Sequence, residues 1–224
     1  MKKKQEKLKR QVVDQLYWND RIDASNVKVK VEDGIVLVDG TVPSYVERVQ
    51  IPKLIQQIQG VKGVENNLII QFPPAITVPK DPEIRSSIRS LLASNAGIDA
   101  SKINVSVNSG AVHLRGTVDS LWKKFRVEDI IADLQGVKSI TNELTVVPTE
   151  DSLDEKIAEE VLATLRRNIN VDVENVNIKV KEGNVHASGT VEDWNAYLAV
   201  RNAIRCTKGV LNMEDEMTIQ SKIM

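Results

Sequence analysis

The side chains of this chain that are best suited to chemistry are two histidines and one cysteine. His113 and His186 stand in separate segments, and neither is accompanied by the further Cys, His or carboxylate ligands that a metal ion requires. Cys206 has no His or Asp at a spacing that would activate it as a nucleophile, and a lone cysteine forms no internal disulfide. We therefore expect two half-exposed strand histidines, a free thiol, no metal or other cofactor, and no enzymatic activity.

A second candidate is the tetrad Gly60-Val61-Lys62-Gly63, which spells the Gly-x-x-Gly of KH-type RNA-binding modules. The corresponding tetrads that begin at Gly136 and Gly209 lack the second glycine, and the first leads from a helical pattern into a strand rather than joining two helices. The formal net charge of -1 also provides no general excess of Lys and Arg for phosphate contacts. Nucleic acid is therefore not an expected partner.

Three threonines that follow a glycine and precede a valine reveal a threefold repeat. The repeated segments are VKVKVEDGIVLVDGTV from Val27, INVSVNSGAVHLRGTV from Ile103 and VNIKVKEGNVHASGTV from Val176. We expect the threonine hydroxyls to satisfy main-chain groups at the strand exit rather than to bind a ligand. The glycines recur at constant spacing and mark the fold: Gly34, Gly40 and Gly60; Gly110, Gly116 and Gly136; Gly183, Gly189 and Gly209.

The hydrophobic periodicity of each copy predicts one order of elements. A stripe at i, i+4 and i+8 favours a first helix, with Leu8, Val12 and Leu16 in the first copy. Alternating valines on either side of Asp33-Gly34 are typical of a tight β-hairpin. A second helix and a short last strand follow, with a C-cap glycine expected at the helix end. The fold class is therefore α+β, with three tandem αββαβ modules, each a three-stranded sheet with two helices on one face.

The boundaries of the copies follow from the same pattern. We place repeat 1 at residues 1–72, a Pro-rich linker at 73–80, repeat 2 at 81–147 and repeat 3 at 148–224. Proline at the density of the linker favours a stiff, extended spacer.

The valine-rich hairpin ending in Gly-Thr-Val, the Gly-Val-Lys after the second helix and the final Asn-x-Leu strand resemble the BON domain. This family is named for osmotically induced periplasmic proteins and nodulation-related proteins, and the resemblance covers nearly the whole chain. It implies an αββαβ fold and a non-catalytic role associated with envelope maintenance and phospholipid binding. No ligand residues are carried over, and the glycines transfer as fold markers only. Pro52 departs from the pattern, and we expect it to kink or shorten the second helix of the first copy.

Two clusters suggest contact with a phospholipid surface, because basic side chains attract anionic headgroups and Trp or Tyr side chains rest at the headgroup level. One cluster is the basic first helix and the other is the start of the second helix in the later copies. Aromatic residues at helical spacing lie more often in a core, and a lysine-rich helix start is often merely solvated. The candidate membrane-contact residues are Lys2, Lys3, Lys4, Lys7, Lys9, Arg10, Trp122, Lys123, Lys124, Arg126 and Trp194.

The outer sheet face of the first copy is a candidate partner surface. Alternation places Ile35, Leu37 and Ile69 on that face, whereas the later copies carry mostly polar residues there. Exposed apolar clusters mark binding sites, but the linker residues Ile76 and Val78 or another copy would also cover such a face.

The leading functional hypothesis is a stress-related protein that binds phospholipid surfaces peripherally. A protein–protein scaffold that uses the apolar outer face is the alternative, and a small-ligand or ion sensor is a further one. No segment is apolar over the length that spans a bilayer, and the N-terminal lysines precede no signal-peptide core. The chain as given is therefore expected in the cytoplasm, or in the periplasm if a signal was removed. The sequence predicts no oligomeric state.

Overall fold

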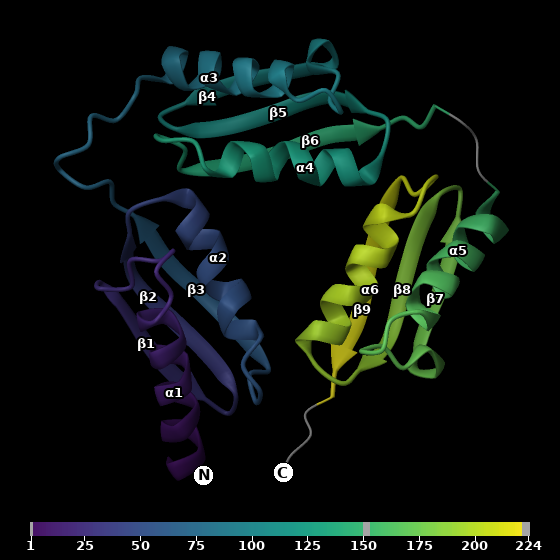
Figure 1. Cartoon of the computed structure of the whole chain (residues 1–224), viewed down its shortest axis with the longest axis horizontal. Coiled ribbons are helices and arrows are strands. Elements are labelled where there is room, and N and C mark those ends of the chain that lie inside the picture. Colours follow the sequence, from purple (N-terminus) through teal and green to yellow (C-terminus); the bar gives the residue numbers. More distant parts are fainter. Residues whose placement is uncertain (1, 150–152, 221–224) are drawn as a thin grey trace. The chain divides into compact units, whose positions relative to one another are not determined.

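The computed structural model describes residues 2–149 and 153–220 and shows an α+β fold of three repeated modules (Figure 1). Module 1 comprises α1 (Lys2–Tyr17), β1 (Val27–Glu32), β2 (Ile35–Val42), α2 (Tyr45–Gln56) and β3 (Gly63–Ile70). Module 2 comprises α3 (Asp81–Ser94), β4 (Ile103–Asn108), β5 (Ala111–Val118), α4 (Leu121–Ala132) and β6 (Ser139–Val146). Module 3 comprises α5 (Asp154–Arg166), β7 (Val176–Lys181), β8 (Asn184–Val191), α6 (Trp194–Cys206) and β9 (Asn212–Ile219). The predicted αββαβ order is confirmed.

Each module forms its own three-stranded sheet, in which the second strand is central. In module 1, β1 pairs antiparallel with β2, and β3 pairs parallel with β2. The parallel pair follows from α2, which carries the chain back so that β3 runs in the same direction as β2. The first and last strands are consequently the edges of each sheet.

Both helices of a module cover the same face of its sheet. The core of module 1 joins Val12 and Leu16 of α1 and Ile51 of α2 to Val36 and Val38 of β2. Since Val36 and Val38 stand two positions apart on a strand, they point to one face, and both helices pack there. The predicted helix stripes are confirmed in all three modules, and their residues are buried: Leu8, Val12, Leu16, Ile84, Ile88, Leu92, Ile157, Val161 and Leu165.

The hairpins turn through two residues with positive φ, as a type I′ turn requires. These pairs are Asp33 and Gly34 at φ 48° and 89°, with Ser109-Gly110 and Glu182-Gly183 in the later modules. In module 2 the carboxylate of Asp81, in the first turn of α3, accepts the main-chain N–H groups of Ser109 at 2.7 Å and Gly110 at 3.0 Å. The first helix therefore fixes the hairpin turn beside it, and Asp154 does the same in module 3.

The glycine of Gly-Thr-Val allows a close approach of the backbone. A Cβ at Gly40 would lie 2.0 Å from the carbonyl oxygen of Asn26, and Gly116 and Gly189 meet the same obstacle. Their φ values of 122° to 124° are also outside the range that other residues favour. The recurrence of this glycine therefore has a steric cause.

Two details differ from the expectations. Gly60 is not the helix C-cap, because α2 ends at Gln56 and Gln57 caps it; Gly60 turns the chain in the loop that follows, at φ 97°. Pro52 does not shorten α2 relative to its counterpart in module 2, because α2 and α4 are each 12 residues long. Proline has no N–H for the Arg48 carbonyl, but that carbonyl accepts from Asn66 Nδ2 at 2.8 Å. The equivalent bond from Asn142 to Lys124 is present in α4, which has no proline.

Candidate binding surfaces

The basic residues of α1 lie mainly on the side of the helix that faces away from the core. Lys3, Lys4, Lys7 and Arg10 are exposed, and Lys9 is half-buried. Lys3, Lys7 and Arg10 follow the spacing i, i+4 and i+7, which places their side chains on one face. The side chain of Lys2, a further candidate, is outside the described residues. The α1 basic face is defined here as Lys3, Lys7 and Arg10.

The same helix ends in an exposed aromatic pair that the sequence analysis missed. Tyr17 is 76% and Trp18 81% exposed, and their rings meet edge-on with centroids 5.2 Å apart. Exposed apolar side chains that adjoin one another are candidates for contact with a partner or lipid surface. A signal existed in the sequence, because neither residue falls on the stripe of Leu8, Val12 and Leu16.

The candidate membrane-contact residues of module 2 are less exposed than those of α1, and one of them is held in an ion pair. Trp122 is 45% exposed and Arg126 is exposed, but Lys123 and Lys124 are half-buried. The Lys123 ammonium is held at 2.7 Å by the carboxylate of Asp119. This pairing leaves Trp122 and Arg126 as the open members of the cluster.

Trp194 does not join an exposed basic surface. It is partly buried and meets the Tyr197 ring edge-on at 4.9 Å. Its indole Nε1 is buried without a hydrogen-bond partner. The interpretation of Trp194 as a core residue therefore fits its position better than membrane contact.

The three residues of the candidate partner face are not contiguous. Ile35 and Leu37 lie two positions apart on β2, whereas Ile69 lies opposite Thr41, four positions further along the sheet. Asp39 and Asn67 stand between them and form a side-chain hydrogen bond of 3.2 Å. Ile35 remains 43% and Ile69 67% exposed, so these positions are open but form two small apolar spots rather than one patch.

His186 has a carboxylate partner that the sequence did not reveal. Its Nε2 lies 3.2 Å from the carboxylate of Glu216, on the outer face of the module 3 sheet. Within residues 2–149 and 153–220, no group of three or more His, Cys, Asp or Glu side chains is placed to hold a metal ion.

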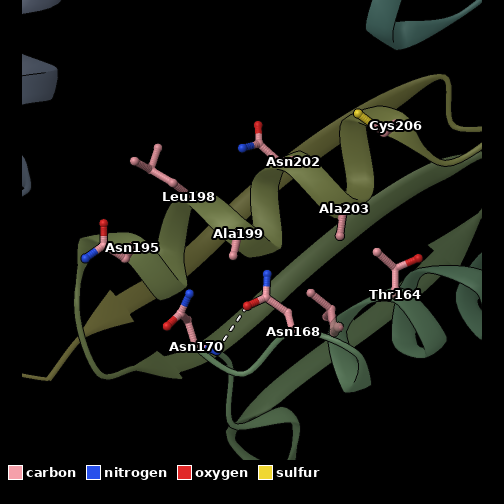
Figure 2. A pocket seen from close by; sticks show the side chains of 10 residues that line it. Thr164, Asn168, Asn170, Asn195, Leu198, Ala199, Asn202, Ala203 and Cys206 are labelled. Atoms are coloured by element: carbon pink, nitrogen blue, oxygen red, sulfur yellow. Dashed lines mark hydrogen bonds between the residues drawn. The ribbon is translucent and has the colours of Figure 1, made fainter.

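A shallow groove runs between α5 and α6 in module 3 (Figure 2). Its volume is 520 Å³, and its polar side chains are amides and hydroxyls together with the exposed thiol of Cys206. Asn168 Oδ1 accepts the main-chain N–H of Asn170 at 3.0 Å, which holds the groove wall in place. None of the described residues that line it is charged. The groove therefore offers hydrogen bonds and a single thiol, but no carboxylate or histidine. The side chains that offer the hydrogen bonds are Thr164, Asn168, Asn170, Asn195 and Asn202.

No helix in the described part of the chain is both long enough and apolar enough to cross a membrane.

The repeated αββαβ modules define a tandem-repeat protein of the α+β class. The chain belongs to the BON domain family, whose model matches residues 4–71, 80–148 and 153–221. The matches account for all three modules and confirm the resemblance of the glycine-spaced hairpins.

Two curated relatives share this similarity. Osmotically-inducible protein Y of Escherichia coli (strain K12) is 28% identical over 141 residues, which are 62% of this chain and 68% of the relative. An uncharacterized protein from the gshII 5′ region of Anaplasma centrale is 28% identical over 118 residues, 52% of this chain and 78% of the relative.

Among solved structures, the chain matches CdsD, a structural protein of the type III secretion system of Chlamydia trachomatis. The identity is 13%, with 94% of this chain and 90% of that chain covered, and the TM-score is 0.26. The PrgH periplasmic domain matches at 11% identity, 87% and 95% coverage and a TM-score of 0.23.

Proposed function

We propose that this protein binds anionic phospholipid surfaces peripherally through α1, as part of a response to osmotic or envelope stress. The observation that carries the proposal is the combination on one helix of the exposed α1 basic face with the open Tyr17-Trp18 pair. The similarity to osmotically-inducible protein Y supports the stress context.

Each side chain contributes only a small part of the free energy of adsorption, and the contributions add. A basic side chain near an anionic membrane contributes roughly 1 kcal/mol, an attraction that salt screens. Trp and Tyr rings rest at the headgroup level, where they are partly dehydrated but keep their polar atoms in water. Asp14 lies on α1 between the basic face and the aromatic pair and opposes the attraction slightly. We therefore expect adsorption to depend both on the basic side chains and on the aromatic pair.

The test is co-sedimentation of the whole chain with vesicles of anionic or neutral phospholipid, at low and at physiological salt. We expect adsorption to anionic vesicles only, weakened by salt and abolished by the triple variant Lys3→Glu, Lys7→Glu and Arg10→Glu. The matched triple variant is Lys123→Glu, Lys124→Glu and Arg126→Glu, with the same change in net charge. It is expected to retain most adsorption, because Lys123 is already paired with Asp119.

Absence of adsorption to anionic vesicles at low salt would refute the proposal. Equal losses in the two triple variants would refute the assignment to α1, since net charge rather than a local surface would then control adsorption.

A further inference from the structure

The open edge of the module 1 sheet lies beside an apolar groove. β1 is an edge strand of its sheet, and α1 packs alongside it (Figure 1). Between them lies a groove of 260 Å³ whose wall is mainly apolar, with Asp23 and Ser25 as its polar residues. The remaining lining residues are Val13, Leu16, Tyr17, Ile22, Ala24, Val27 and Val29. Val13 is 44% and Tyr17 76% exposed, and Val27 is partly exposed, so part of the apolar wall is open to solvent.

The main chain of β1 has hydrogen-bonding groups that face this open side. Glu32 pairs with Ile35 across the two-residue turn, and Val29 pairs with Val38. In an antiparallel hairpin of this kind, every second residue directs its N–H and C=O away from the partner strand. Those of Val29 and Val31 point to the open edge, whereas the N–H of Val27 is taken by the Ala24 carbonyl at 3.0 Å.

The other face of β1 is basic. Lys28 and Lys30 are exposed on the outer face of the sheet, and neither forms a salt bridge within residues 2–149 and 153–220. Lys30 lies opposite Leu37 in the register, and Lys28 lies opposite Asp39. Lysines on an edge strand generally disfavour pairing with another chain, but opposite charges that face each other across two strands attract. The lysines therefore leave pairing with an acidic strand favourable.

We infer that β1 binds an extended peptide segment of another protein, which adds to the sheet as a fourth strand and alternates apolar with acidic side chains. Main-chain hydrogen bonds to Val29 and Val31 would supply affinity, and the alternation would supply selectivity. The apolar side chains enter the groove beside Val13 and Tyr17, while the acidic ones meet Lys28 and Lys30. This site contains none of the residues of the α1 basic face, but it shares Tyr17 with the aromatic pair.

Module 1 is distinguished from the later modules at the positions that overhang the edge strand. The counterparts of Val13 and Tyr17 are Arg89 and Ala93 in module 2, and Leu162 and Arg166 in module 3. The first residue of the edge strand is buried in both later modules, as Ile103 and Val176, whereas Val27 is partly exposed. The apolar groove and the lysine pair therefore coincide at β1.

The probe is a short capped peptide that alternates valine and glutamate, titrated into the whole chain and followed by calorimetry and by amide chemical shifts. We expect saturable binding with shifts centred on residues 27–31. The variant Lys28→Glu with Lys30→Glu should weaken it by about ten-fold or more, since rim charges of one sign are reversed. The same variant should gain affinity for a valine–lysine peptide. The matched variant Lys179→Glu with Lys181→Glu has the same change in net charge and should bind as the unaltered chain does.

A second probe tests strand addition without altering the protein. N-methylation of one alternate set of peptide amides should abolish binding, and methylation of the other set should not, because only one edge of the added strand faces β1. Equal tolerance of both methylated peptides would overturn strand addition.

Three further outcomes would overturn the inference: no saturable binding, equal losses in the β1 and β7 variants, or a concentration-dependent dimer that Lys28→Glu with Lys30→Glu dissolves. The last outcome would assign the edge to a second copy of the chain. Vesicle adsorption of the β1 variant is expected to persist, so failure here and failure of the lipid proposal remain distinguishable.

Discussion

The Tyr197 hydroxyl donates a 2.6 Å hydrogen bond to the carboxylate of Asp215, tying α6 to the edge strand β9. Arg201 Nη1 reaches the same carboxylate oxygen at 2.9 Å and the Tyr197 oxygen at 3.1 Å. The position of Asp215 is held by asparagine in the other modules, where Asn66 and Asn142 donate to main-chain carbonyls of α2 and α4. Module 3 thus makes the same helix-to-strand connection with charged side chains.

Loss of the Asp215 carboxylate is expected to destabilise module 3. Asp215→Ala leaves Tyr197 and Arg201 without their shared acceptor, at a cost of about 2 kcal/mol for charge-assisted hydrogen bonds. Asp215→Asn should cost less, because its amide can donate to the Tyr197 carbonyl as Asn66 does to Arg48. Hydrogen exchange of the β9 and α6 amides measures the loss of stability in both variants, and the variant Glu214→Ala, at an exposed position, is the control. Equal exchange in Asp215→Ala and in the unaltered chain would contradict the role of the carboxylate.

Burial raises the pKa of Tyr197, and its hydrogen bond to Asp215 adds to the effect. Since the folded state favours the protonated phenol, the resulting stability is present below the unfolded pKa of about 10 and is lost as pH rises through the folded pKa. We therefore expect the stability difference between the unaltered chain and Tyr197→Phe to be constant at neutral pH and to shrink in strong alkali. Absorbance titration of the two proteins should assign to Tyr197 a phenolate transition above the usual range. A transition at or below that range would contradict the prediction.

The elements were predictable because their signals are local. The stripe of Leu8, Val12 and Leu16 and the alternation around Asp33-Gly34 each depend on residues a few positions apart, which a helix or hairpin brings together by its own geometry. The predicted helix stripes at i, i+4 and i+8 are therefore buried in all three modules, and the predicted hairpin glycines lie in the turns.

The surfaces were less predictable because they depend on packing between distant segments. Strand order places Ile69 beside Thr41 rather than near Ile35, and no local pattern encodes that register. The hydrogen bond between Asn67 and Asp39 likewise joins residues that only the sheet register brings together. By contrast, the ion pair of Lys123 with Asp119 spans four positions and was readable from the spacing alone. The predicted domain boundaries and the membrane-contact role remain predictions.

Gly116→Ala is expected to disrupt module 2. The added Cβ would stand 2.0 Å from the Lys102 carbonyl oxygen, and alanine would have to adopt a φ of 124°. Strain of this kind costs about 3 kcal/mol or more once the clash is included. The control is Gly97→Ala in the same module, where the nearest atom is 3.8 Å away. Thermal denaturation should separate the two, and equal melting profiles would contradict the steric explanation.

Asp81→Ala is expected to loosen the hairpin turn between β4 and β5 in module 2. The Ser109 and Gly110 N–H groups lose their acceptor, which should cost about 1–2 kcal/mol. Asp81→Asn retains one carbonyl oxygen and should recover part of the loss. Hydrogen exchange at Ser109 and Gly110 reports the change directly, and exposed Arg85→Ala serves as the control. Protection that survives in Asp81→Ala would show that the turn holds without the helix.

Trp18 is expected to enter the headgroup region when the chain adsorbs to anionic vesicles. In a chain with Trp122→Phe and Trp194→Phe, Trp18 is the sole tryptophan, and its emission should shift to the blue with anionic but not with neutral vesicles. A chain that retains only Trp122 is the matched control and should shift less, because its neighbour Lys123 is paired with Asp119. Trp18→Ala in the unaltered background should weaken adsorption by about ten-fold, the effect of removing one large interfacial ring. Adsorption that proceeds with no change in Trp18 emission would leave the basic face as the sole contact and contradict an anchoring role for the aromatic pair.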